Sequence, residues 1–257
     1  MSQTASPSTV VTAAMLAIGD ELLSGRTKDK NISHLADMLT LAGIDLKEVR
    51  IVSDEEEAIV EALNALRGRY TYVFTSGGIG PTHDDITADS ISRAFGLPCV
   101  HDPDAMQLLA EMYQRREMEF TEARQRMARM PKGARHIANP VSTAPGFIVE
   151  NVYVMAGVPQ VFQAMLDNVL PELRTGSKML SLAIACPFGE GDIGTPLAAI
   201  QKAHPQTSIG SYPKYDGKRF STEIVVRARE QAEVDAAVAD VQQMVQDLEE
   251  KHLAPNG

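Results

Sequence analysis

The sequence predicts an α/β protein built in layers, with a mostly parallel sheet in a large N-terminal domain and a small α+β domain after it. Apolar runs of strand character alternate with segments of helical spacing over residues 11–173. A short polar, glycine-containing break follows at residues 174–178. Residues 178–253 then have the order strand, helix, strand, strand, helix, which is typical of a split β-α-β or ferredoxin-like unit. Residues 1–10 are small and polar, and we expect a disordered tail there.

The N-terminal domain begins with a buried strand and continues as an alternation of helices and strands. Glycine or proline ends several of the helices, and the sequence Ser-Asp-Glu-Glu at 53–56 matches a capping box at the start of one of them. A short hairpin is predicted around Glu150-Asn151. The predicted strands are 13–18, 44–52, 70–75, 147–149 and 152–155, and the predicted helices are 31–42, 53–66, 86–95, 102–117, 121–130 and 158–170.

The C-terminal domain has fewer elements. We expect strands at 179–185, 208–212 and 221–227, and helices at 193–203 and 230–251. The last helix carries one apolar stripe with acidic residues elsewhere, as expected of a helix that covers a small sheet.

Composition narrows the function classes. The 257 residues have a formal net charge of −10 and a pI of about 5.1, which argues against a nucleic-acid partner held by a basic surface. Cys99 and Cys186 lie far apart and predict neither a disulfide framework nor a zinc site. No run of 18 apolar residues and no signal peptide is present, so we expect a cytoplasmic protein without a membrane span.

The most informative stretch is the glycine loop after the strand at 70–75. The chain leaves that strand through Gly77-Gly78-Ile79-Gly80 and reaches a predicted helix shortly afterwards. A tight turn explains one or two glycines, but three within four positions exceed what a turn needs. Exposed backbone N–H groups beside a helix N-terminus suit a phosphate. The predicted ligand-binding residues of this loop are Ser76, Gly77, Gly78, Gly80 and Thr82.

Acidic residues follow the glycine loop and also the first strand. Asp84 and Asp85 would repel a phosphate unless a divalent cation lies between them, although one of them could simply cap the following helix. Asp20 and Glu21 follow the strand at 13–18, either as an ordinary solvent-facing pair or at the same edge of the sheet. Carboxylates gathered there fit Mg or Mn. We therefore predict Asp20, Glu21 and Asp85 as metal ligands.

Two further loops could approach a ligand through their small side chains. The alternative is that both are only turns, one before the hairpin and one before the helix at 158–170. Their candidate ligand-binding residues are Asn139, Thr143, Ala144, Pro145, Gly146, Gly157 and Pro159. His83 lies within the glycine loop and could touch a phosphate, whereas the other histidines form no ligand pattern.

Four motifs together resemble a known family. They are Ala17-Ile-Gly-Asp-Glu-Leu-Leu-Ser-Gly25, Thr75-Ser-Gly-Gly-Ile-Gly-Pro-Thr-His-Asp-Asp-Ile-Thr87, Asn139-Pro-Val-Ser-Thr-Ala-Pro-Gly146 and Met155-Ala-Gly-Val-Pro159. In this order they resemble the N-terminal part of CinA (competence/damage-inducible protein A), within the molybdopterin-binding superfamily of MogA, MoaB and the molybdopterin domain of FAD synthase. The resemblance covers about residues 11–173, and the C-terminal segment looks like the small domain that follows in CinA-type proteins.

The resemblance implies a three-layer α/β fold and a pterin- or nucleotide-binding cleft. It also implies a metal-dependent pyrophosphatase acting on ADP-ribose, or on FAD in the FAD synthase relatives, with Mg, Mn or Co as the metal. Asp85 matches the aspartate that MogA-type proteins use in catalysis, which makes Asp85 the first catalytic candidate and leaves Asp84 as the second. Asp20 matches the Gly-Asp-Glu aspartate of MoeA-like relatives. Ile79 departs from the threonine or leucine of many relatives, which removes one possible hydroxyl contact.

Three functions follow as hypotheses. The first is a pyrophosphatase that cleaves a dinucleotide such as ADP-ribose or FAD; the second is a molybdopterin adenylyltransferase-like enzyme of molybdenum cofactor biosynthesis. The third is a nucleotide- or pterin-binding module without turnover. All three expect a small-molecule nucleotide or pterin, with molybdopterin as one possible ligand, and by resemblance a homo-oligomer. The chain stops near where full-length CinA proteins begin their nicotinamide mononucleotide deamidase domain, so we expect that activity to be absent.

Overall fold

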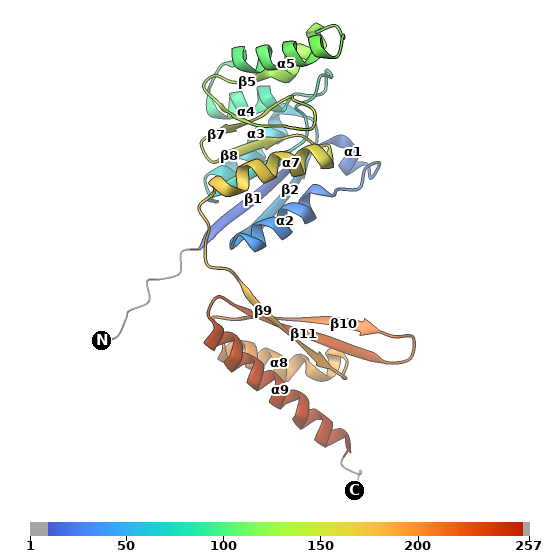
Figure 1. Ribbon diagram of the computed structural model, residues 1–257. Helices are drawn as coiled ribbons and strands as arrows, with labels where there is room; N and C mark the ends of the chain where they lie inside the picture. Colours follow the sequence, from blue (N-terminus) through green and yellow to red (C-terminus); the bar gives the residue numbers. More distant parts are fainter. Residues whose placement is uncertain (1–9, 254–257) are drawn as a thin grey trace, which may run out of the picture. The chain divides into compact units, whose positions relative to one another are not determined.

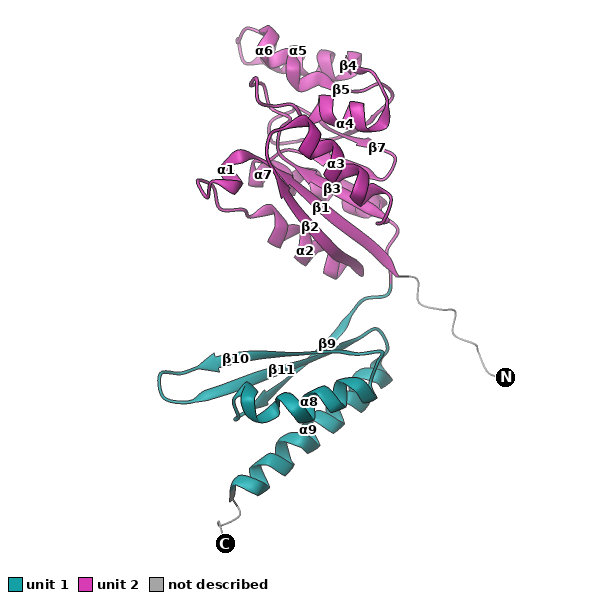
Figure 2. Ribbon diagram, turned by 180° about the vertical axis from the view of Figure 1, so that it is seen from behind, with its two compact units in different colours: residues 1–8, 177–257 teal, residues 9–176 magenta. Residues whose placement is uncertain are grey.

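The structure is a computed structural model that describes residues 10–253, so the predicted tail lies outside the described residues except for Val10. The chain divides into two compact units between Gly176 and Ser177. Figure 1 follows the chain from end to end, and Figure 2 colours the two units separately. Within residues 10–253, the N-terminal unit has two sheets and two apolar clusters, the C-terminal unit has one of each, and each unit is described by itself below.

The N-terminal unit is built on a six-stranded sheet in the order β2-β1-β3-β8-β7-β6. The four strands from β2 to β8 run parallel, and β7 and β6 continue the sheet antiparallel. The mostly parallel sheet and the hairpin of β7 and β8 are therefore confirmed. The strands are β1 (Val11–Ile18), β2 (Ile44–Val52), β3 (Tyr72–Ser76), β6 (Arg135–Ile137), β7 (Gly146–Val149) and β8 (Val152–Met155).

Helices cover both faces of this sheet and complete three layers, as Figures 1 and 2 show from opposite sides. On one face, α2 (Asn31–Leu41) and α7 (Pro159–Val169) pack on alternate residues of β1 and β3, including Met15 and Phe74. On the other face, α3 (Glu56–Arg67) packs on the intervening residues, including Leu16, and α4 (Thr87–Phe95) and α5 (Pro103–Arg115) extend the same apolar cluster outward. Because both faces are covered, β1 reads as a continuous apolar run.

Short elements are where the structure departs from the sequence prediction. The helix expected at 121–130 is wrong: after α6 (Glu122–Gln125) and the 3₁₀ turn η1 (Arg126–Ala128), the chain becomes strand β5 (Arg129–Pro131), which pairs with β4 (Cys99–His101). Asp20 and Glu21 lie in a four-residue helix, α1 (Asp20–Leu23), which was not predicted. A 3₁₀ turn, η2 (Leu170–Glu172), follows α7.

The capping box predicted at 53–56 is also wrong. Helix α3 begins at Glu56, and its N-cap residue Glu55 makes no side-chain capping bond. The Asp54 carboxylate instead accepts a hydrogen bond from the backbone N–H of Asp20 at 3.0 Å. A longer-range bond between the ends of β1 and β2 has replaced the local cap.

The C-terminal unit is a split β-α-β arrangement. Its three-stranded antiparallel sheet has the order β10-β11-β9, so β9 and β10 run parallel with β11 between them. Both helices pack on the sheet through one apolar cluster that includes Ile224, Val226 and Val241. The elements are β9 (Leu180–Cys186), α8 (Glu190–Ala203), β10 (Ser208–Tyr215), β11 (Phe220–Ala228) and α9 (Gln231–Leu253). Among residues 10–253, no helix is both long enough and apolar enough to cross a membrane.

Candidate functional site

The candidate site lies where the parallel strands β1, β2, β3 and β8 end; we call these strand ends and the loops that follow them the carboxyl edge. Strands β1 and β3 are neighbours, with Ala17 beside Ser76. The N–H of Gly19 donates to Val52 O at 3.1 Å, and the N–H of Gly77 donates to Met155 O at 3.2 Å. Because β2 lies on one side of β1 and β3 on the other, the strand order reverses at this point, and open α/β sheets bind ligands at such a reversal.

Packing explains two glycines of the loop at once. Gly77 and Gly78 have φ angles of +111° and +67°, which disfavour any residue with a Cβ atom. A Cβ at Gly77 would lie 2.2 Å from Ile18 O, and one at Gly78 would lie 2.1 Å from the Thr87 hydroxyl oxygen. That hydroxyl donates to Gly77 O at 3.0 Å, and the Thr87 N–H donates to Gly78 O at 3.0 Å. The loop is thereby held against the start of α4.

The two aspartates after the loop have different environments. Oδ2 of Asp85 accepts the Thr82 N–H at 2.8 Å and the Thr82 hydroxyl at 2.5 Å, and the carboxylate lies against Gly80, where a Cβ would be 2.6 Å away. Asp84 is exposed, and the nearby Thr82 hydroxyl is the main influence that lowers its pKa, followed by its own backbone N–H and by His83. Neither aspartate caps α4, which begins at Thr87 with Ile86 as an N-cap without a side-chain bond. That alternative is wrong.

Four carboxylates gather at the carboxyl edge. Burial raises the pKa of Asp54, and the charges of Asp20, Glu21 and Asp84 raise it further, against the opposing hydrogen bond from the Asp20 N–H. The carboxylates of Asp20, Glu21 and Asp84 raise the pKa of Asp54 because they lie near it. Asp54 was missed by the sequence prediction, although it follows the second strand much as Asp20 follows the first.

These carboxylates suit a hard cation by chemistry, since all of their donor atoms are oxygens. Within the described part of the chain, however, no three His, Cys, Asp or Glu side chains are already arranged as a metal-binding group. One carboxylate oxygen of Asp85 already accepts two hydrogen bonds from Thr82. The assignment of Asp20, Glu21 and Asp85 to a metal stays a prediction, and Asp54 and Asp84 join the candidate donors.

Asn31 is a second residue that the sequence prediction missed. It is the first residue of α2, only 3% exposed, and its side-chain NH₂ donates to Ser76 Oγ at 2.7 Å and to Gly157 O at 2.9 Å. It therefore ties the start of α2 to the ends of β3 and β8. Its carbonyl oxygen is buried without a hydrogen-bond partner. A signal was present in the sequence, because Asn31 occupies the same helical stripe as Leu35 and Leu39.

Arg126 brings positive charge to the same region. Its guanidinium donates to Asp85 O at 3.2 Å, while its buried Nε has no hydrogen-bond partner. Arg126 comes from η1, about forty residues along the chain, and no local pattern marked it. A guanidinium beside the glycine loop is a suitable partner for a phosphate.

The remaining predicted residues fall into two groups. Gly157 lies against the glycine loop, since a Cβ there would be 3.3 Å from Gly77 Cα, and Pro159 is the first residue of α7. Asn139, by contrast, uses its side chain within its own loop, where it accepts from the N–H groups of Val141 and Ser142 and donates to Ser142 and Ala144. Thr143 and Pro145 belong to that loop, and Gly146 begins β7 where a Cβ would be 2.4 Å from Val154 O.

Comparison with known families agrees with this geometry. Residues 14–175 match the family model described as a probable molybdopterin binding domain. The chain belongs to the molybdopterin-binding family. Residues 178–252 match the model for the middle domain of FAD synthase, so the two matches fall on the two units.

Relatives and solved structures place this member of the molybdopterin-binding family with CinA-type proteins. A CinA-like protein of Citrifermentans bemidjiense is 44% identical over 62% of this chain and 40% of its own length. A protein of Pyrobaculum arsenaticum is 34% identical over 79% of this chain and 80% of its own. The crystal structure of the protein CinA, of unknown function, from Thermoplasma acidophilum is 29% identical, covers 63% of this chain and 98% of its own, and has a TM-score of 0.59. The expected resemblance is confirmed.

Proposed function

We propose that this protein is a divalent-metal-dependent pyrophosphatase that cleaves a dinucleotide such as ADP-ribose or FAD. The observation that carries the proposal is the juxtaposition of Asp20, Glu21, Asp54 and Asp84 with a glycine loop and Arg126 at one edge of the sheet. A site that offers both anion-binding N–H groups and clustered carboxylates suits a phosphate and a cation together.

Different residues of the site would bind the phosphates, hold the cation and act in catalysis. The guanidinium of Arg126 would bind the phosphate oxygens of the substrate, together with the N–H groups of the glycine loop other than that of Gly77, which is bonded to Met155 O. Asp20, Glu21, Asp54 and Asp84 would hold the cation, with water completing its coordination. When bound, such a cation offsets the charge that develops on the pyrophosphate and helps to activate a water. Asp85 is the proposed catalytic carboxylate, positioned by its two hydrogen bonds to Thr82.

A second candidate is favoured by the family match to a molybdopterin-binding domain. It is a molybdopterin adenylyltransferase-like enzyme that would use the same loop and Asp85. The carboxylates around Asp54 rank it second, because they add negative charge beyond what binding of an anionic pterin would need.

The test is incubation of the purified chain with ADP-ribose or FAD and Mg, Mn or Co, with AMP release as the readout. We expect AMP with at least one metal and a rate about 10²-fold or more lower in Asp85→Asn. Asp167→Asn, an exposed acid on α7, is the matched control and should keep the rate. No AMP with any metal, or a rate in Asp85→Asn equal to that of the wild type, would overturn the proposal. Adenylation of molybdopterin by ATP would select the second candidate, and tight binding without product would select a binding module.

A further inference from the structure

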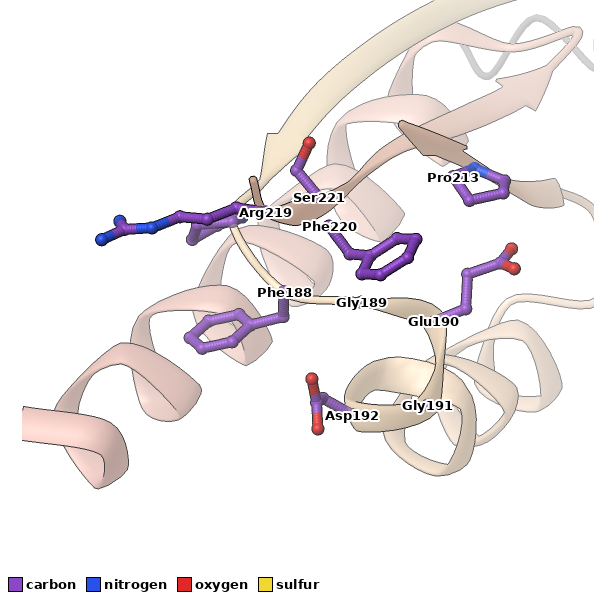
Figure 3. A pocket seen from close by; sticks show the side chains of 10 residues that line it. Phe188, Gly189, Glu190, Gly191, Asp192, Pro213, Arg219, Phe220 and Ser221 are labelled. Atoms are coloured by element: carbon purple, nitrogen blue, oxygen red, sulfur yellow. The ribbon is translucent and has the colours of Figure 1, made fainter. Parts of the chain in front are cut away.

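The C-terminal unit contains a cavity far along the chain from the carboxyl edge. Its volume is about 630 Å³, within the usual range for small-molecule sites. Figure 3 shows that the cavity is formed by the turn from β9 into α8 and by the end of the β10–β11 hairpin. Its lining includes Gly189, Glu190, Asp192, Pro213, Arg219 and Phe220.

The cavity lies where the β10–β11 hairpin extends beyond its pairing with β9. Strands β10 and β11 pair as far as Tyr215 and Phe220, whereas β9 pairs with β11 only from Thr222 onward. By strand alternation Phe220 is on the same face as the buried Thr222 and Ile224, the face on which the helices pack. Tyr215 and Phe220 are nevertheless 60% and 66% exposed.

These two rings form an uncovered aromatic surface. Their centroids are 4.6 Å apart with an angle of 31° between the planes. In Figure 3 the Phe220 ring points into the cavity, beneath Pro213 and above the Gly189–Glu190 turn. An exposed pair of aromatic rings on the core side of a sheet leaves apolar surface in water, which a flat ligand would cover.

Opposite charges lie on the two sides of the Phe220 ring. In Figure 3 Glu190 lies beside the Phe220 ring and Asp192 lies below it, while the Arg219 side chain extends away from the ring on the other side. Glu190 Oε1 accepts the Ser211 hydroxyl at 2.5 Å, which leaves Oε2 available. Among the described residues, the side chains of Arg219 and Asp192 have neither a hydrogen bond nor an ion pair. Both charges are therefore available to a ligand.

We propose that this cavity binds a mononucleotide whose base carries an amino group, such as an adenine nucleotide. The base stacks on Phe220, its amino group donates to Glu190 or Asp192, and the phosphate pairs with Arg219. A simple anion would be repelled by the two carboxylates, and a simple cation would leave Arg219 without a role. The site belongs to the C-terminal unit, whereas the carboxyl edge belongs to the N-terminal unit, and the proposal does not depend on the proposed function.

The first experiment titrates the full chain with AMP, by calorimetry and by amide NMR. We expect the amide signals of Gly189 and Gly191 to shift on binding, whether or not those of Gly77 and Gly78 at the carboxyl edge also shift. Adenosine, which lacks the phosphate, and inosine monophosphate, which lacks the amino group, should each produce these shifts only at concentrations about tenfold higher. AMP shifts confined to Gly77 and Gly78, or no shift at all, would overturn the proposal.

The second experiment uses variants of the hairpin. Phe220→Ala should weaken AMP binding at this site about tenfold, because it removes the stacking surface. Arg219→Ala should remove the preference for AMP over adenosine. Tyr212→Ala is the matched control, since Tyr212 is 44% exposed on the opposite face of the same hairpin and should keep wild-type binding. Equal AMP affinity in Phe220→Ala and Tyr212→Ala would refute the assignment.

Discussion

Replacing Asn31 with alanine is expected to change the stability of the N-terminal unit very little and to weaken ligand binding at the carboxyl edge. The change removes the two hydrogen bonds that the Asn31 side chain donates to Ser76 Oγ and Gly157 O. It also removes the Asn31 carbonyl oxygen, which is buried without a partner in the intact protein. The two effects on stability have opposite signs.

Their magnitudes nearly cancel. Two neutral hydrogen bonds contribute about 2 kcal/mol in total, while an unpartnered buried acceptor costs about 1–3 kcal/mol. The free energy of unfolding of Asn31→Ala should therefore lie within about 1 kcal/mol of the wild type. Asn31→Asp keeps the size of the side chain, but it loses both donors and sets a charged oxygen against Gly157 O in a site that is 3% exposed. We expect that variant to lose more than about 3 kcal/mol.

The assay is urea unfolding followed by near-ultraviolet circular dichroism. The chain contains no tryptophan, and the group of Tyr72, Phe74 and Tyr153 reports on the N-terminal unit. Affinity for ADP-ribose, measured by calorimetry, should fall about tenfold in Asn31→Ala because Ser76 and Gly157 are no longer tied together. A loss of more than about 2 kcal/mol in Asn31→Ala, or an Asn31→Asp variant no less stable than Asn31→Ala, would refute the reasoning.

Two further predictions concern the glycine loop and a surface carboxylate. Gly78→Ala should destabilise the N-terminal unit by about 1–3 kcal/mol more than Gly25→Ala in the same unfolding assay. Both glycines have φ near +70°, but only at Gly78 would a Cβ meet another atom, the Thr87 hydroxyl oxygen at 2.1 Å. Equal losses of stability in the two variants would contradict this. Tyr70→Phe should raise the pKa of Glu48 in an NMR titration, because the Tyr70 hydroxyl bond at 2.6 Å is the largest influence that lowers it, ahead of Arg50. Since the folded pKa of Glu48 lies below its unfolded value, the stability that Glu48 contributes is present above the unfolded pKa and is lost as pH falls through the folded pKa. The free energies of unfolding of the wild type and Tyr70→Phe should therefore differ near pH 7 and converge in acid. An unchanged Glu48 titration would contradict this.

The long elements could be predicted because their signals are local. Strand β1 is an apolar run, α2 carries an apolar stripe that ends before Gly43, and the hairpin turns at Glu150-Asn151. The short strands β4, β5 and β6 have three residues each, so they contain less than two periods of strand alternation. Their pairing is decided by partners distant in the sequence, which a local pattern does not contain.

The residues of the candidate site also fall into those that a local pattern marks and those that distant segments contribute. Gly77, Gly78 and Asp85 could be recognised because they are contiguous with a strand and a helix start. Asn31, Asp54 and Arg126 could not be placed, because each reaches the carboxyl edge from another segment: Asn31 contacts Ser76, Asp54 contacts Asp20, and Arg126 contacts Asp85. Side-chain reach across the fold becomes visible only once the strand order is known.

The close approach of Gly157 to Gly77 has a thermodynamic consequence for ligand binding. The two backbones are too close for a relaxed Cβ at Gly157, the Gly77 N–H is bonded to Met155 O, and Asn31 holds Ser76 and Gly157 from the side. Loops fixed in this way have already lost their conformational entropy when the chain folds, about 1–2 kcal/mol for each ordered residue. A ligand that meets a preorganised loop keeps more of its interaction energy as affinity. Binding at this edge should therefore be tighter than the few side-chain contacts alone would suggest.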